Sequence, residues 1–246
     1  MEIIAHRGAS HDAPENTLAA FRLAWEQMAD AVELDIHLSK DDKLVVIHDD
    51  DTKRTAGVAR KVRNQTFDQL RKLDLGRWKG KEWIAEKIPT LDEVLSMVPE
   101  GKRLFVEFKS GRAAIPEFQA AIERSGKKPH RIVAIGFSEP TMKAVKAALP
   151  ELEVCWISKF KRNWNTGRWF PTAEQLIHAA QKAGLDGVDL DARGPVDVGL
   201  VKKLKAAKLA VYVWTVDSPI QARRLAEAGV DGITTNRPGW LRDKLK

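Results

Sequence analysis

Short apolar runs alternate with longer amphipathic stretches along the whole chain. The apolar runs predict strands at residues 3–6, 31–36, 103–109, 131–136, 153–157, 187–191, 210–216 and 232–235. The stretches between them predict helices at residues 17–28, 91–98, 115–123, 141–149, 172–182, 198–208 and 220–228. Strands that alternate with helices are typical of βαβ units in a parallel sheet. Eight such strands in 246 residues predict a TIM (β/α)8 barrel rather than an open doubly wound sheet, which usually has fewer strands.

One further apolar run, at residues 44–48, follows the second predicted strand too closely for a helix to intervene, which predicts a hairpin. If the hairpin loop has an even number of residues, Asp35 lies opposite His48 and both side chains share one face, whereas an odd loop turns His48 away. Residues 49–89 are polar and interrupt the alternation, with at most one short helix at residues 67–73. We expect them to form a small insertion over the barrel mouth, within a single domain of residues 1–246.

Ionisable and aromatic residues gather where the predicted strands end. In TIM barrels the active site forms at these carboxyl ends, where a purely structural strand would carry Val, Ile or Leu. Side chains two apart on a strand share a face, so Glu33 and Asp35 point the same way, as do Glu107 and Lys109. The residues at the strand ends are His6, Arg7, Glu33, Asp35, Glu107, Lys109, Phe137, Asp189, Asp191, Trp214, Thr235 and Asn236.

Three acidic side chains that face into a barrel, those of Glu33, Asp35 and Glu107, repel one another and resist burial unless they are neutralised. A hard divalent cation neutralises such a group. Because the ligands are all oxygen and no cysteine or histidine cluster has zinc spacing, Mg²⁺ or Ca²⁺ is favoured over zinc. The alternative is that each acid pairs with a nearby base, for which Arg7 or Lys109 is available.

Two histidines, His6 and His48, end strands beside the acidic cluster. Two imidazoles around a cation and a basic pair are typical of phosphoryl chemistry. The cation, Arg7 and Lys109 would stabilise charge on the phosphate oxygens. One imidazole would take a proton from the attacking hydroxyl or water, and the other would protonate the departing alkoxide. The alternative for each histidine is a packed, hydrogen-bonded core residue.

The net charge of +7 raises another class, a non-enzymatic nucleic-acid-binding protein. The Lys and Arg residues are spread singly over expected helix faces without a recognition motif, so we expect no nucleic-acid partner. No apolar run approaches the ~20 residues of a membrane span, and no signal peptide is visible. We therefore expect a cytoplasmic enzyme without stable membrane insertion, although a leader removed from a precursor stays an open alternative. The single cysteine, Cys155, is expected in the core, and the oligomeric state is left undetermined.

Seven short motifs occur in order along nearly the whole chain. They are His-Arg-Gly-Ala at 6–9, Ala-Pro-Glu-Asn-Thr at 13–17, Glu-Leu-Asp-Ile-His-Leu at 33–38, Val-Ile-His-Asp at 46–49 with Arg54-Thr55, Ile-Pro-Thr-Leu at 88–91, Glu-Phe-Lys at 107–109 and Trp-Thr-Val-Asp at 214–217. In this combination the chain strongly resembles the glycerophosphodiester phosphodiesterase family. That family has a TIM-barrel fold with a small insertion after the second catalytic histidine, which would correspond to residues 49–89 here.

The resemblance implies roles for individual residues. It implies metal-dependent hydrolysis of a small glycerophosphodiester to glycerol 3-phosphate and an alcohol. A glycerol hydroxyl attacking first, to give a cyclic phosphate, and direct attack by water both stay open. The implied site comprises an acid–base pair, His6 and His48; metal ligands Glu33, Asp35 and Glu107; phosphate-binding residues Arg7 and Lys109; Glu15 supporting Arg7 or the metal site; and Trp214 bordering the glycerol.

Other interpretations keep the barrel and change the chemistry. A phospholipase D-type lyase would stop at a cyclic phosphate, and a sugar-phosphate isomerase or aldolase would need a Schiff-base lysine or other metal ligands. The aromatic and cationic loop at 159–170 is expected to pack on the barrel rim, with a cap over the mouth or a contact to lipid head groups as alternatives. Asp189 and Asp191 are either hydrogen-bonded acids or a rival cation site, and His37 is expected in a supporting position at most.

Overall fold

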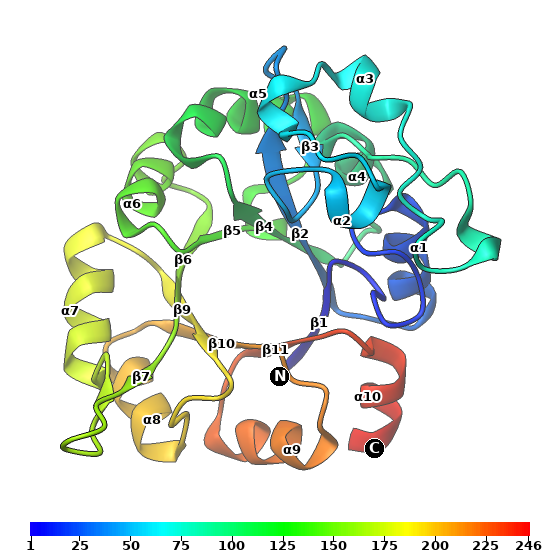
Figure 1. The fold of residues 1–246 in the computed structure, drawn as a ribbon. Helices are drawn as coiled ribbons and strands as arrows, with labels where there is room; N and C mark the ends of the chain where they lie inside the picture. The colour runs from blue at the N-terminus through cyan, green and yellow to red at the C-terminus, as the bar shows by residue number, and fades with distance from the viewer.

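Eight parallel strands close into a barrel in the computed structural model, which describes all residues, 1–246 (Figure 1). Each strand pairs with its neighbours in parallel, and β1 pairs with both β2 and β11, which closes the ring. The predicted (β/α)8 barrel is therefore confirmed. Its strands are β1 (Glu2–His6), β2 (Ala31–Leu38), β4 (Arg103–Phe108), β5 (Ile132–Gly136), β6 (Glu153–Ser158), β9 (Gly187–Asp191), β10 (Ala210–Trp214) and β11 (Gly232–Thr235).

Helices follow the strands and form the outer ring (Figure 1). The seven predicted helices are present as α1 (Leu18–Glu26), α4 (Leu91–Met97), α5 (Ile115–Ser125), α6 (Glu139–Ala148), α7 (Ala173–Ala183), α8 (Val198–Ala206) and α9 (Pro219–Ala228). Two 3-10 turns, η3 (Gly111–Ala114) and η4 (Pro129–Arg131), and a last helix, α10 (Pro238–Leu245), were not predicted. None of these helices is long and apolar enough to cross a bilayer.

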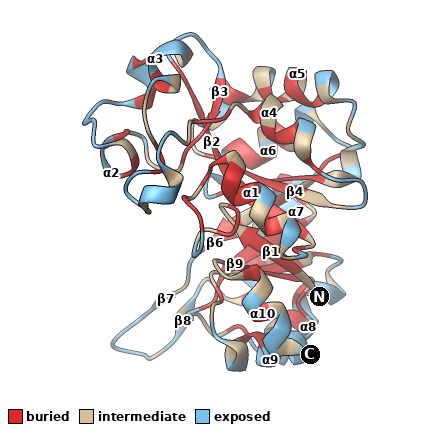
Figure 2. Ribbon diagram, turned by 90° about the vertical axis from the view of Figure 1, so that its right-hand side faces the viewer, coloured by how far each residue is buried: buried red, intermediate tan, exposed pale blue.

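The strand alternation divides the apolar residues into two cores. Side chains that point outward from the barrel pack against the helices in a cluster of 48 buried residues. Those that point inward form a much smaller cluster of eight, which includes Ile4, Phe105 and Cys155. The ring of strands is accordingly mostly buried, with half-buried residues chiefly at the strand ends (Figure 2). The interior core is small because polar side chains fill the rest of the barrel.

A short strand, β3 (Leu44–Val46), runs antiparallel to the end of β2, as the predicted hairpin requires. Asp42 has a φ of 58°, so an aspartate adopts the left-handed conformation of the turn. Leu38 lies opposite Leu44 and Ile36 opposite Val46, which corresponds to an odd loop. The pairing of Asp35 with His48, which required an even loop, is therefore wrong.

Residues 49–89 contain four short helices, α2 (Lys53–Ala56), η1 (Val62–Asn64), α3 (Phe67–Arg71) and η2 (Lys81–Trp83), so the expectation of at most one helix is wrong. Apolar side chains from this segment and from β3 share a separate small core, which includes Ile47, Leu70 and Ile88. The expected short helix at residues 67–73 is present as α3. The other three were missed because each has four residues or fewer, too short for a periodic pattern.

The aromatic loop at 159–170 forms a hairpin of β7 (Lys161–Arg162) and β8 (Trp169–Phe170), which projects from the barrel (Figure 2). Phe160 packs against the main core, but the Trp164 side chain at the tip is 90% exposed. Packing of the loop's aromatic residues on the rim is therefore wrong for Trp164. In Figure 2 the hairpin and the α2–α3 segment project from the same end of the barrel.

Candidate active site

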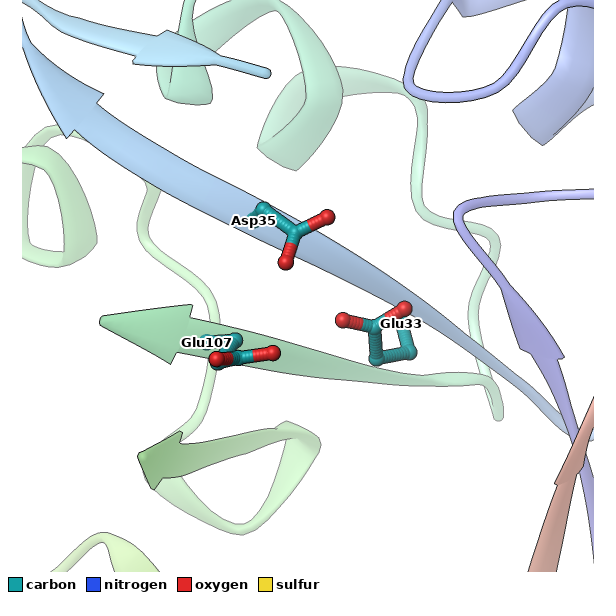
Figure 3. A group of neighbouring side chains, drawn as sticks. All are labelled: Glu33, Asp35 and Glu107. Atoms are coloured by element: carbon teal, nitrogen blue, oxygen red, sulfur yellow. The ribbon is translucent and has the colours of Figure 1, made fainter. Parts of the chain in front are cut away.

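Three buried carboxylates lie together inside the barrel. Glu33 and Asp35 project from β2, and Glu107 projects from β4, directly beside Asp35 in the strand register (Figure 3). Each offers an oxygen that lies within 4.8 Å of the other two. No other group of three potential metal ligands occurs in the chain. The neighbouring strand ends thus bring together the three acids that the sequence analysis selected.

The electrostatics of these carboxylates fits a bound cation. Burial, together with the Asp35 charge, raises the pKa of Glu33 and raises that of Glu107 to about 7. Asp35 Oδ1 and Glu107 Oε1 are buried and accept no hydrogen bond of good geometry. Oxygen donors that are buried and close together are the kind of ligand set that a hard divalent cation uses. The donor set is all oxygen, which suits Mg²⁺ or Ca²⁺.

Two cations flank the acids. The Lys109 ammonium lies 3.1 Å from Asp35 Oδ1 and 2.6 Å from Glu107 Oε1, and Arg7 Nε lies 3.2 Å from Asp35 Oδ2. Burial alone would raise the pKa of Asp35, but Lys109 and Arg7 outweigh it and hold that pKa below its ordinary value. Asn16 adds a hydrogen bond of 2.8 Å from Nδ2 to Asp35 Oδ2. Asp35 is therefore held as an anion, with basic groups on both sides.

The turn after β1 positions Arg7. Arg7 has a φ of 56°, and Gly8 follows with a φ of 81°. A Cβ at Gly8 would lie 2.6 Å from the Ala20 backbone of α1, so glycine is required by both conformation and space. In this turn the Arg7 backbone N–H donates to Glu33 Oε2, and Arg7 Nη1 donates to Glu15 Oε1, both at 2.9 Å.

His6 is held as a neutral ring with a defined tautomer. Burial, followed by the charge of Arg7, lowers the pKa of His6 to about 4. Asn236 donates through its amide to Asp217 Oδ2, so its Oδ1 oxygen faces the ring nitrogen Nδ1 of His6 at 2.7 Å. An amide oxygen only accepts, so His6 Nδ1 carries the proton and Nε2 keeps a lone pair.

The His48 side chain also lines the cavity, although the alternation of side chains along β3 does not predict its direction. β3 ends at Val46, and His48 lies in a bend after it, where the alternation of strand side chains no longer applies. His37 Nε2 is 3.2 Å from the His48 carbonyl oxygen, which ties the bend to β2. The His48 ring nitrogen Nδ1 donates to Asp49 Oδ1 at 2.7 Å, and Asp49 in turn accepts from Arg54.

One cavity collects most of the expected residues. Asp35 is buried beneath the cavity, and Glu15 lies behind Arg7, shared with Arg54. The lining comprises His6, Arg7, Glu33, His48, Glu107, Lys109 and Trp214, together with Ile135, Phe137, Ile157, Lys159, Asp189 and Thr234.

Several supporting residues escaped the sequence analysis or differ from it. Asn236 was noted only as a strand end, and neither Asp49 nor Lys159 was assigned a role. Thr234, and not Thr235, lines the cavity. Asp189 is buried with Oδ1 unpartnered and a pKa raised by burial, whereas Asp191 pairs with Arg193, so the two do not form a rival cation cluster. The signals for Asp49, Asn16 and Asp217 were their places inside the recognised motifs.

Residues 6–240 match the sequence profile described as the glycerophosphoryl diester phosphodiesterase family. A glycerophosphodiester phosphodiesterase of Caldanaerobacter subterraneus subsp. tengcongensis is 32% identical over 97% of this chain and 95% of its own length. A putative glycerophosphodiester phosphodiesterase of Bacillus subtilis, YhdW, is also 32% identical, over 98% of this chain and 96% of its own.

Solved structures of phosphodiesterases are also similar to this chain. A phosphodiesterase of Oleispira antarctica, determined with its product sn-glycerol 3-phosphate, has a TM-score of 0.88 and 26% identity, covering 100% of this chain and 96% of that one. A glycerophosphodiester phosphodiesterase of Thermotoga maritima has a TM-score of 0.77 and 28% identity, covering 100% of this chain and 98% of its own. The similarity thus extends over the whole barrel and its insertion.

Proposed function

The chain belongs to the glycerophosphoryl diester phosphodiesterase family, and on that premise we propose that it hydrolyses glycerophosphodiesters to glycerol 3-phosphate and an alcohol by metal-dependent histidine catalysis. It is an enzyme, a phosphoric diester hydrolase of the glycerophosphodiester phosphodiesterase type. We propose that class over the nucleic-acid-binding and isomerase alternatives. The observation that carries the proposal is one cavity lined by two imidazoles, two cations and two of the three clustered acids, with the third, Asp35, buried next to them.

Glu33, Asp35 and Glu107 would hold the divalent cation. A cation bound there supplies positive charge against the phosphate oxygens. Arg7 and Lys109 add two further positive charges at the same cavity and orient the phosphodiester. Glu15 keeps the Arg7 guanidinium in position through its 2.9 Å ion pair. The single domain proposed for residues 1–246 carries all of these groups.

The environments of the two histidines support different roles. His6 is neutral, with a lowered pKa of about 4 and its Nε2 lone pair free, which suits a general base toward the attacking hydroxyl or water. His48 donates through Nδ1 to the Asp49 carboxylate, which orients the ring. That arrangement suits a general acid toward the departing alkoxide.

A related structure supports the proposal that the substrate contains a glycerol phosphate group. The Oleispira antarctica phosphodiesterase was determined with sn-glycerol 3-phosphate as its product. In this chain the Trp214 side chain lines the cavity and its Nε1 donates to the Asp189 carbonyl oxygen at 3.3 Å, which fixes the indole ring. We assign Trp214 to the wall of the glycerol site.

The test is a substrate and metal panel. Purified protein is stripped with a chelator and assayed on glycerophosphocholine, -ethanolamine, -inositol and -glycerol, with Mg²⁺, Ca²⁺ or no metal, and phosphorus NMR identifies the products. We expect no turnover without metal, recovery with Mg²⁺ or Ca²⁺, and glycerol 3-phosphate as the product. Full activity in excess chelator would contradict the metal site. A cyclic phosphate that persists would assign the reaction to a lyase.

The histidine roles are tested by His6→Ala and His48→Ala, each expected to lower kcat at least ~10²-fold, the usual size of one acid–base contribution. His130→Ala is the matched control, because His130 is an exposed histidine in η4 outside the cavity. Circular dichroism checks that each variant keeps the barrel. A variant of either cavity histidine with near-normal kcat would disprove its acid–base role.

A further inference from the structure

Two aromatic rings at the cavity mouth lie beside an exposed lysine, Lys159, that the proposed mechanism does not use. Phe137 and Trp214 meet edge to face, with ring centroids 5.7 Å apart and planes at 89°. The Lys159 ammonium lies 5.0 Å from the Phe137 centroid and 5.5 Å from the Trp214 centroid. All three residues line the catalytic cavity. The Lys159 ammonium thus occupies a position beside the Phe137 and Trp214 rings that a cationic group of a ligand could otherwise take.

The Lys159 ammonium differs from the other cations of the cavity in having no anionic partner. Arg7 and Lys109 each contact two carboxylates, but Lys159 forms neither an ion pair nor a hydrogen bond. The neighbouring Asp191 carboxylate is occupied by Arg193, at 2.6 Å. The three N–H donors and the charge of Lys159 are therefore available to a molecule bound in the cavity.

The charge of Lys159 beside the two rings should distinguish substrates by the charge of their head groups. Paired aromatic faces attract quaternary and primary ammonium groups through cation–π interaction, the contact by which proteins recognise choline. Here the ring faces are already occupied by Lys159, and its charge repels a second cation. A hydroxyl-rich or anionic group instead accepts hydrogen bonds from the ammonium. The Phe137 side chain is 43% exposed, so this subsite opens to solvent, where a variable head group has room.

We propose that Lys159 is a specificity-determining residue, which disfavours glycerophosphodiesters with cationic head groups and favours those with hydroxyl-rich or anionic ones. The inference rests on the proposed diesterase function and names the substrate class that this cavity selects. Since Phe137 and Trp214 would remain after removal of the lysine, the subsite should then accept choline.

The experiment compares kcat/KM for glycerophosphoinositol and glycerophosphocholine in wild type, Lys159→Met and Lys159→Arg. We expect the wild type to prefer the inositol substrate. Lys159→Met should shift the ratio about 10-fold toward the choline substrate, the size of a partly desolvated cation–π contact. Lys159→Arg keeps the charge over the rings and should retain the wild-type preference. Lys161→Met is the matched control, because Lys161 is an exposed lysine two residues along, outside the cavity.

Each other outcome overturns the inference in a distinct way. An equal loss on both substrates in Lys159→Met would show that Lys159 serves the glycerol phosphate they share. Unchanged constants on both substrates would show that Lys159 takes no part in selection. If the wild type hydrolyses neither these nor any other glycerophosphodiester in the presence of metal, the proposed function itself fails. Turnover of the wild type therefore separates failure of the selection from failure of the function.

Discussion

The pKa of the Glu107 carboxyl group reflects opposing influences from its surroundings. Burial and the Asp35 carboxylate raise the pKa of Glu107 to about 7, although the Lys109 ammonium at 2.6 Å lowers it. The ordinary value is 4.5, so the folded, metal-free chain binds this proton more tightly than the unfolded chain does. Stability from Glu107 is therefore fully present below pH 4.5 and is lost as the pH rises through 7.

The direction of this pH dependence gives a prediction for the protein from which a chelator has removed the metal. Between about pH 5 and pH 8, the Tm of the wild type should fall relative to that of Glu107→Gln, whose side chain does not titrate. The comparison cancels His6, whose lowered pKa acts in the opposite direction in both proteins. Adding Mg²⁺ or Ca²⁺ should reduce the difference, because a cation replaces the proton on the carboxylate. Parallel Tm profiles of the two chelated proteins would contradict the raised pKa.

At the scale of elements, the short helix α2 joins the insertion to both halves of the site. Arg54, on this helix, donates to both Glu15 oxygens at 2.8 Å and to Asp49 Oδ2 at 2.7 Å. Glu15 in turn holds Arg7, and Asp49 holds His48. One guanidinium thus positions the proposed phosphate-binding residue Arg7 and the proposed acid–base residue His48, which lie far apart in the sequence.

Loss of this link should affect turnover more than folding. We expect Arg54→Ala to lower kcat about 10-fold, the usual effect of removing a partner that orients active-site groups, with a smaller change in KM. Because Arg54 is partly exposed, its ion pairs add little stability, so the Tm should change little. Lys53→Ala, an exposed cation beside it on α2, is the control. A change in KM alone would indicate substrate contact instead of positioning.

At the scale of the whole molecule, the barrel interior is layered along its axis. The catalytic cavity occupies the carboxyl end of the strands, and the eight-residue apolar cluster lies below it. At the amino end, Arg103 of β4 forms ion pairs with Glu2 of β1 and Glu153 of β6, and donates to the Tyr212 hydroxyl of β10. Four strands are joined across the barrel by this one side chain.

Replacement of Arg103 should therefore destabilise the barrel. Its side chain is 17% exposed, and its removal leaves two carboxylates facing each other in a half-buried site. We expect Arg103→Met to cost about 2–4 kcal/mol in the free energy of unfolding, measured by urea denaturation. Arg124→Ala is the control: Arg124 also pairs with two acids, but its side chain is 48% exposed, so the cost should stay below ~1 kcal/mol. Equal losses would show that burial does not govern these pairs.

The order of the strands, seven of the helices around the barrel and the acids at the strand ends could all be predicted from the amino-acid sequence. These follow from local periodicity: residues two apart on one strand share a face whatever surrounds them, so Glu33 and Asp35 had to point together. Parallel strands then bring their carboxyl ends to one mouth, which collects His6 and Lys109. The hairpin made His48 a candidate only on the condition of an even loop, and the motifs added Glu15 by resemblance.

Features that depend on contacts between distant segments could not be predicted and are defined by the folded barrel. The direction of His48 depends on a bend held by His37, and the strand register alone pointed the other way. The tautomer of His6 depends on Asn236, 230 residues away. The cation between Phe137 and Trp214 comes from a third strand end, at Lys159. Local patterns carry no information about such contacts, because their geometry is set by the closure of the whole barrel.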